Sequence, residues 1–256
     1  MILTADVGNS NIVLAIFDND EIIKQWRIVT VKDKSKDEYQ MVIEQLMDIA
    51  KIDIKKIEGI VISSVVPELN FVLPEALSFI TNKILVLGDN GVKTNVKIKS
   101  VNERKIGSDI IANIVAGKSY CKENFIIVDM GTATTFDIAV QNGDYAGSII
   151  LTGANLCVDA LHKAASQLPL IEVKKPNQFL GNTTIDMMKS GIYYGYIGAI
   201  KEIISQIKNT FPDIQFKIFL TGGVSKVFVH DLQFVDAVLP DLTSVGLNEI
   251  WKINKK

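Results

Sequence analysis

The sequence predicts an α/β protein that is built from two related domains. Residues 2–18 (ILTADVGNSNIVLAIFD) and 125–137 (FIIVDMGTATTFD) share one pattern: an apolar run, an Asp, an apolar residue, a Gly, small polar residues and a second apolar run. A chain of 256 residues also exceeds the usual size of a single domain. Strands and helices alternate in each half. We expect one domain at 1–115 and another at 116–256.

The two repeated stretches each predict a β-hairpin with a Gly in its turn. Gly8 and Gly131 remove the Cβ where a ligand would approach the backbone, and Asp6 and Asp129 end the preceding strands, where carboxylates can hold a cation. Small polar side chains surround the turns: Asn9, Ser10, Thr132 and Thr134. Either turn alone is compatible with an ordinary tight turn. Their duplication favours phosphate binding.

Composition excludes several function classes. The 27 basic and 29 acidic residues give a net charge of −2, which offers no electrostatic basis for binding nucleic acid or membranes. The N-terminus has no basic region, and no apolar run is long enough for a membrane span, so we expect a cytoplasmic protein. The cysteines and histidines have no metal-ligand spacing. They are Cys121, Cys157, His162 and His230.

The first half continues beyond its hairpin with alternating strands and helices. Residues 21–30 are rich in β-branched residues and predict a third strand, and 37–51 have helical apolar spacing with Asp37 as a possible cap. The apolar run 59–64 predicts a buried parallel strand. Pro67 suits the first turn of a helix that reaches residue 79. A further strand is expected at 84–87.

The segment 91–118 is expected to connect the halves, and it contains Gly107-Ser108-Asp109 at the start of a helix. Two interpretations remain open for this motif. Ser108 or Asp109 could be a simple N-cap. Alternatively, Asp109 points into the cleft between the domains and accepts a proton from a hydroxyl group that attacks ATP.

The second half contains a strand at 144–151, a helix at 153–167 and a long helix at 183–208. Gly191, Gly195 and Gly198 in the long helix would let another backbone approach closely, or would simply serve tight helix packing. A strand at 216–221 ends in Gly222-Gly223, and 241–251 predict a closing helix.

The duplicated hairpin and the later Gly-Gly turn resemble the actin-like, sugar-kinase-like ATPases, in which two ribonuclease-H-like α/β domains enclose a nucleotide cleft. Within that superfamily the chain resembles the type III pantothenate kinases nearly from end to end. The matching stretches are DVGNSNIVLAIFD, SSVVPE, GVKT, IGSDIIANIVAG, IIVDMGTATTFD, LPLIEV, LGNTTIDMMKSGIYYGYIGAI, LTGG and PDLTSVGL.

This resemblance implies ATP-dependent phosphorylation of pantothenate to 4′-phosphopantothenate, the first step of coenzyme A biosynthesis. It implies a divalent cation such as Mg²⁺ near Asp6, a monovalent cation (K⁺ or NH₄⁺) at Asp129, Asp109 as proton acceptor, and a homodimer. The residues expected around ATP are Asp6, Val7, Gly8, Asn9, Ser10, Asn11, Ile12, Val13, Thr132, Gly222 and Gly223. Those expected around pantothenate are Gly107, Ser108, Asp109, Ile110 and Thr184.

The chain also departs from the family pattern. The family has Arg where this sequence has Ile110, and Ile cannot imitate a bidentate carboxylate binder. A usual Tyr and Pro correspond to Ser100 and Glu103, and Arg104 or Lys105 could supply the missing positive charge. Two alternatives therefore stay open: a catalytically impaired, nucleotide-binding regulatory or accessory protein, and a sugar or acetate-type kinase of the same superfamily.

Overall fold

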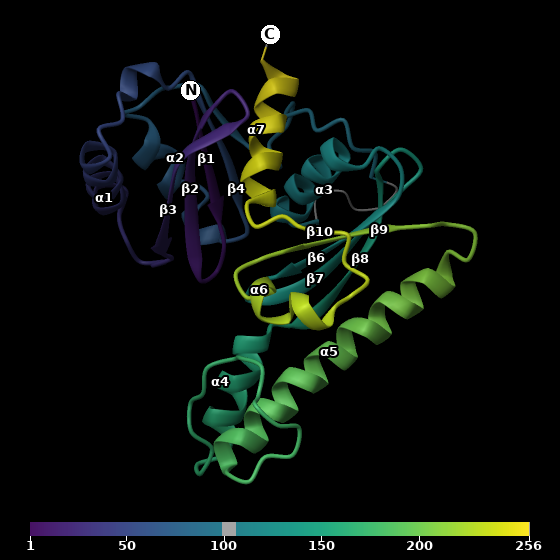
Figure 1. Ribbon diagram of the computed structural model, residues 1–256. Helices are drawn as coiled ribbons and strands as arrows, with labels where there is room; N and C mark the ends of the chain where they lie inside the picture. The colour runs from purple at the N-terminus through teal and green to yellow at the C-terminus, as the bar shows by residue number, and fades with distance from the viewer. Residues whose placement is uncertain (99–105, 256) are drawn as a thin grey trace. The chain divides into compact units, whose positions relative to one another are not determined.

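The computed structural model describes residues 1–98 and 106–255, which form two compact units (Figure 1). The first unit comprises residues 1–120 together with the chain from Leu242 onward, and the second comprises Cys121–Asp241. The α/β fold class is confirmed, because each unit contains one five-stranded sheet with helices. No helix in the described ranges is both long and apolar enough to cross a membrane.

The sheet of the first unit has the strand order β3-β2-β1-β4-β5. Its strands are β1 (Ile2–Val7), β2 (Asn11–Asp18), β3 (Glu21–Val29), β4 (Gly59–Ser64) and β5 (Ile84–Val86). The first three strands are antiparallel neighbours, whereas β4 and β5 run parallel to β1. The carboxyl ends of β1 and β4 therefore lie at the same edge of the sheet.

Two helical layers cover this sheet, because apolar side chains alternate between its faces. On one face, Leu3, Ala5 and Val7 pack with α1 (Lys36–Ile49) and α2 (Val72–Leu77). On the other, Ile2 and Val61 pack with α3 (Ser108–Tyr120) and α7 (Leu242–Asn254). Two short 3₁₀ turns, η1 (Ile54–Lys56) and η2 (Pro67–Leu69), complete the unit.

Two expected helix boundaries of the first unit differ from the structure. Ser35, not Asp37, caps α1: its hydroxyl accepts from the Glu38 N–H while the Glu38 carboxylate accepts from the Ser35 N–H, which is a complete capping box. The helix expected from Pro67 to residue 79 is divided into η2 and α2.

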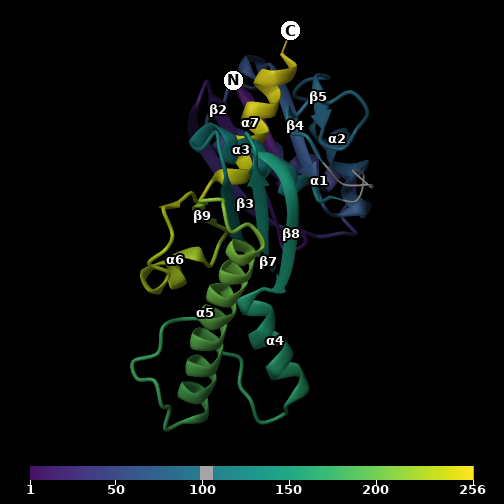
Figure 2. The ribbon, with the colours of Figure 1, turned by 90° about the vertical axis from the view of Figure 1, so that its right-hand side faces the viewer.

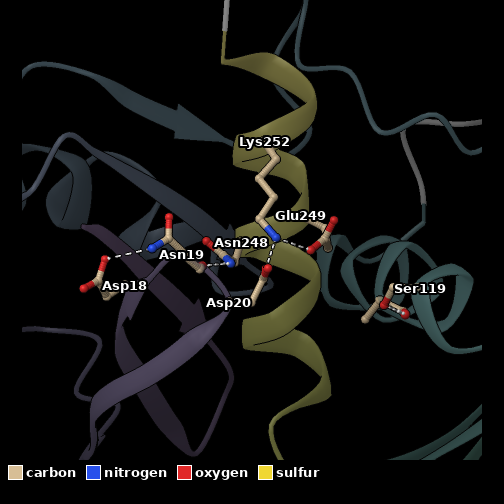
Figure 3. Close-up of polar contacts among 8 residues, drawn as sticks. Asp18, Asn19, Asp20, Ser119, Asn248, Glu249 and Lys252 are labelled. Atoms are coloured by element: carbon tan, nitrogen blue, oxygen red, sulfur yellow. Dashed lines mark hydrogen bonds and ion pairs between the residues drawn. The ribbon is translucent and has the colours of Figure 1, made fainter.

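The C-terminal helix α7 returns to the first unit, so the compact units are bounded differently from the expected ranges 1–115 and 116–256. Gly246 lies so close to α3 that a Cβ there would be 1.9 Å from the Ala112 carbonyl oxygen. Polar contacts also join α7 to the β2–β3 turn (Figure 3): the Asn248 amide donates to the Asn19 carbonyl, and Lys252 pairs with Asp20. Close packing and these contacts attach α7 to the first sheet.

The second unit repeats the sheet order of the first, as β8-β7-β6-β9-β10. Its strands are β6 (Phe125–Met130), β7 (Ala133–Val140), β8 (Asp144–Thr152), β9 (Lys217–Thr221) and β10 (Ala237–Val238). Three antiparallel strands are again followed by parallel ones. The repeated hairpins of the sequence are thus the first two strands of two sheets with the same topology.

One face of the second sheet is covered by α4 (Ala154–Ala164), α5 (Thr184–Thr210) and α6 (Ser225–Phe228), with the 3₁₀ turn η4 (Val229–Asp231) after α6. Figures 1 and 2 show α4 beside the first turns of α5. Gly191, Gly195 and Gly198 are exposed, and a Cβ at any of them meets no atom within 4 Å in the described chain. No neighbouring backbone of this chain therefore uses the space that they leave.

Candidate active site

The first hairpin turn, between β1 and β2, is fixed by backbone contacts. The Gly8 N–H donates to the Asn11 carbonyl over 3.0 Å, and a Cβ at Gly8 would lie 3.2 Å from that oxygen. Thr30, which follows β3, donates its hydroxyl to the Gly8 carbonyl over 2.6 Å and its N–H to the Ser10 carbonyl. Asn9 and Ser10 remain exposed at the tip. Thr30 therefore holds the backbone of the turn in place, while the side chains at its tip are open to solvent.

The second turn, between β6 and β7, has the same internal bond, from the Gly131 N–H to the Ala133 carbonyl over 3.0 Å. It is one residue shorter, since Met130 pairs with Thr134 whereas Val7 pairs with Ile12. Thr132 is exposed. Thr134 does not line the exposed side of the turn with Thr132. The alternation of side chains along β7 directs its hydroxyl into the core, where it bonds the Tyr196 hydroxyl.

A residue that the sequence interpretation missed, Gly153, holds the second turn in place. It precedes α4 and donates its N–H to the Thr132 carbonyl over 3.2 Å. A Cβ at this position would lie 2.1 Å from that carbonyl oxygen. Only glycine fits so close an approach. The sequence signal was the Thr152-Gly153 pair where β8 ends and α4 begins, and its role becomes clear only from the contact between Gly153 and Thr132.

In the first unit, α3 begins next to the carboxyl ends of β1 and β4. Asp6 on β1 pairs in register with Ser63 on β4. The Ser108 hydroxyl lies 2.9 Å from the Ser63 hydroxyl and donates to the Ser64 carbonyl over 3.0 Å. Ser108 is buried and thus attaches α3 to the sheet edge. This attachment brings Asp109 to the same edge as Asp6.

The Asp109 carboxylate is folded over the start of α3. Its Oδ1 accepts from the Ile110 N–H over 2.8 Å, and a Cβ at Gly107 would lie 2.4 Å from that oxygen. Burial raises the pKa of Asp109, and backbone hydrogen bonds partly offset this effect. Ser108 and Asp109 both lie within α3, so neither is the residue that precedes the helix. The Ser108 hydroxyl bonds groups of β4 and no N–H of the first turn, whereas the Asp109 carboxylate accepts from an N–H at the start of the helix.

The position that departs from the family pattern, Ile110, is a buried side chain that is 8% exposed. A charged side chain placed there without a partner would be costly to bury. The residues expected to replace the missing positive charge, Arg104 and Lys105, lie outside the described residues. Ser100 and Glu103 lie outside them as well.

In the second unit, Asp129 is the next-to-last residue of β6 and pairs with Thr221 of β9. Gly222 follows with a φ of 90°, and a Cβ there would lie 2.5 Å from the Met130 backbone nitrogen, so glycine is required twice over. Gly223 is exposed. Thr184 is exposed at the start of α5, after the capping residue Thr183.

The chemistry of the two turns suits a phosphate ligand with a weakly coordinated metal ion. Exposed amide and hydroxyl groups at Asn9, Ser10 and Thr132 follow strands whose next-to-last residues are Asp6 and Asp129. No group of three or more His, Cys, Asp or Glu side chains in the described ranges has the arrangement of a metal centre. Mg²⁺ needs no such cage, because it is commonly bound by one or two carboxylates together with substrate phosphates and water.

Known kinases are similar to this chain over most or all of its length. The family model described as type III pantothenate kinase matches residues 2–206. The type III pantothenate kinase of Geobacter sulfurreducens is 37% identical over 257 residues, and the alignment covers 100% of both chains. These matches are to kinases, so the alternative of an impaired regulatory or accessory protein receives no support from them.

Solved structures share the fold at low sequence identity. MreB 5 of Spiroplasma citri, solved with AMPPNP, has a TM-score of 0.51 at 12% identity and covers 99% of this chain and 95% of its own. A Sinorhizobium meliloti protein assigned as a 2-dehydro-3-deoxygalactonokinase has a TM-score of 0.60 at 9% identity, with 100% and 99% covered. The fold is thus that of the actin-like and sugar-kinase ATPases.

Proposed function

The chain belongs to the type III pantothenate kinase family, and we propose that it transfers the γ-phosphoryl group of ATP to the primary hydroxyl of pantothenate. The product would be 4′-phosphopantothenate, and the reaction would open coenzyme A biosynthesis. One observation carries the proposal. Ser108 attaches α3 to the sheet edge where β1 ends, so Asp109 and Asp6 are presented at one edge of the first unit.

Asp109 is the proposed proton acceptor for the pantothenate hydroxyl. Its raised pKa makes the carboxylate a stronger base than an exposed Asp, and the Ile110 N–H holds one of its oxygens. In phosphoryl transfer, most of the protein's contribution is to position the groups and to stabilise charge. We assign Gly107, Ser108, Ile110 and Thr184 to the surroundings of pantothenate. Ser108 would act there by positioning α3, since its hydroxyl is already bonded.

ATP would contact the two hairpin turns and the Gly-Gly turn. We assign to it the residues Asp6, Val7, Gly8, Asn9, Ser10, Asn11, Ile12, Val13, Thr132, Gly222 and Gly223. Asp6 would hold Mg²⁺, and Asp129 a monovalent cation, K⁺ or NH₄⁺. Asp6 would hold the Mg²⁺ where its positive charge could offset the negative charge that develops on the phosphate oxygens. Asp6 and Asp129 support these assignments because each is the next-to-last residue of the central strand of its sheet, close to an exposed turn.

We further propose that the protein is a homodimer whose contact lies on the second unit. The exposed stripe of Gly191, Gly195 and Gly198 on α5 leaves room for the backbone of another helix. Large apolar side chains are exposed on the same helix, on α4 and on the segment between them. They are Leu156, Leu161, Leu170, Phe179, Leu180, Ile185 and Met187. Apolar exposure of this extent is typical of an interaction surface.

Release of ADP that depends on pantothenate tests the proposed activity. Purified protein with ATP, Mg²⁺ and K⁺ should release ADP when pantothenate is added and should form one 4′-phosphopantothenate per ADP. Replacing K⁺ with NH₄⁺ should preserve the rate, and replacing it with Na⁺ should lower it. No pantothenate-dependent ADP in any of the three salts would refute the kinase assignment. Equal rates in all three salts would refute only the proposed requirement for a monovalent cation at Asp129.

A further inference from the structure

A cavity of about 550 Å³ lies on the second unit, away from the residues assigned to ATP and pantothenate. One wall is a single face of α5, where Tyr194, Ile197 and Lys201 stand three and four residues apart. The other wall consists of Asp231, Gln233 and Phe234. Its volume is within the range of small-molecule sites, roughly 300–1,000 Å³. Size alone therefore allows a ligand.

Two residues that line this cavity, Tyr194 and Asp231, are held in place by contacts with other side chains. The Tyr194 ring packs edge-on against Phe179, with the ring centroids 5.1 Å apart. Asp231 accepts from the Tyr193 hydroxyl over 2.7 Å and forms an ion pair with Lys175 at 2.8 Å. A tyrosine ring and a carboxylate fixed in this way need little reordering when a ligand binds.

Two ammonium groups and one carboxylate determine the charge around the cavity. Lys175 and the Tyr193 hydroxyl already satisfy Asp231, and the Lys175 ammonium group holds the pKa of Asp231 below its usual value. Lys201 forms no direct ion pair with any residue in the described ranges, although its charge also lowers the pKa of Asp231. The lining thus combines an ammonium group that has no direct ion-pair partner with the apolar surfaces of Tyr194 and Phe234.

We propose that this cavity binds a small aromatic ligand that carries one negative charge, such as an aryl carboxylate. The ring would lie against Tyr194 and Phe234, and the anion would pair with Lys201. The Gln233 amide offers a further hydrogen-bond donor at the rim. The site goes beyond the kinase function, because no residue assigned to ATP, cations or pantothenate lines it.

Fluorescence titration with 1-anilinonaphthalene-8-sulfonate, an aromatic monoanion, tests the proposal on the full chain. Lys201→Gln should weaken the binding of this probe about 10-fold, because a hydrogen bond to a charged group is lost. Lys201→Arg should keep the affinity within about threefold, since it retains the charge. The matched control is Lys208→Gln, the same change at an exposed position of α5 outside the cavity, and it should leave the affinity unchanged.

N-phenyl-1-naphthylamine, the uncharged analogue of the probe, separates the charge from the apolar contact. Its affinity should be the same in the parent protein and in Lys201→Gln. The proposal is overturned if Lys201→Gln binds the sulfonate as tightly as the parent does, or if Lys208→Gln weakens it equally. Melting curves of all the variants should coincide, because the changed side chains are exposed.

Discussion

At the scale of single residues, Asp109 is subject to two opposing influences. Burial disfavours its charged form and raises its pKa, whereas the Ile110 N–H stabilises that form. The larger influence is burial. An acid with a raised pKa destabilises the folded state at neutral pH, because it must ionise there at a cost that the unfolded chain does not bear. A role in catalysis therefore explains the burial of Asp109 better than a contribution to the stability of the fold does.

Asp109→Asn should therefore lower turnover strongly without destabilising the fold. The amide oxygen can still accept from Ile110, so the free energy of unfolding at pH 7 should equal or exceed that of the parent. Any excess should shrink as the pH falls through the raised pKa of Asp109, since the parent carboxyl then becomes neutral as well. Turnover of pantothenate should fall by about 10²-fold or more. Steady-state kinetics and pH-dependent denaturation measure both effects.

The control for this prediction is Asp37→Asn, the same chemical change at an exposed position in the first turn of α1. It should leave turnover unchanged. A variant at 109 that lost stability but kept turnover would show that the residue is structural.

At the scale of elements, the turns of both hairpins are positioned by neighbours that come later in the chain. Thr30 after β3 holds the first turn, and Gly153 before α4 holds the second. Gly222 after β9 lies against the β6 backbone in the same way. The two exposed turns are thus fixed from outside the hairpins that contain them. This arrangement allows a short, polar turn to keep one conformation while it is open to a ligand.

Gly153→Ala should disturb the second turn. The new Cβ would lie 2.1 Å from the Thr132 carbonyl oxygen, so α4 or the turn must move, and overpacking of this kind costs about 1–3 kcal/mol. The Michaelis constant for ATP should rise, because Thr132 would be displaced. Urea denaturation and kinetics at varied ATP measure the two changes.

Asn155→Ala is the matched control, since Asn155 is exposed one residue into the same helix. Asn155→Ala should change neither the stability in urea nor the Michaelis constant for ATP by much. If Gly153→Ala were as stable as the parent with an unchanged constant for ATP, the turn would not depend on this contact.

At the scale of the whole molecule, one sheet topology occurs twice in the chain. The second unit also carries a large apolar surface along α4 and α5, next to the glycine stripe of α5. A helix that is glycine-rich on an exposed face is unfavourable by itself, because each Gly costs about 1 kcal/mol relative to Ala. Close association with a second copy of the chain would offset that cost.

Gly195→Leu should dissociate the proposed dimer while the fold is kept. In the described ranges, a Cβ at Gly195 has no atom within 4 Å outside the neighbouring backbone of α5, and leucine favours the helix. The variant should therefore melt at a temperature no lower than that of the parent monomer. In analytical ultracentrifugation the parent should sediment as twice its chain mass of 28.2 kDa, and the variant as one chain. Ser205→Leu, also exposed on α5, should remain a dimer. A monomeric parent would refute the proposal.

The sequence by itself determined the α/β class, the two hairpins and most of the strands. These features depend on local patterns: apolar runs that end in Asp and Gly, and helical spacing in 37–51 and 183–208. It also identified Asp6, Asp109 and Asp129 as candidate residues, because each follows or opens an element with a polar turn beside it. The ends of the helices expected at 37–51, 153–167, 183–208 and 241–251 were correct to within about three residues, whereas the helix expected from Pro67 to residue 79 is divided into η2 and α2.

Only the tertiary structure decided where distant segments meet. The sequence pattern of 241–251 predicts a helix but cannot say that Gly246 and Asn248 attach this helix to the first unit. Asn248 and its partner Asn19 are 229 residues apart in the chain. Nor can the pattern show that Thr134 faces the core, that Ser108 joins α3 to β4, or that Gly153 supports the second turn. Each of these depends on a contact between residues that are far apart in the chain, and propensity and periodicity describe only neighbours.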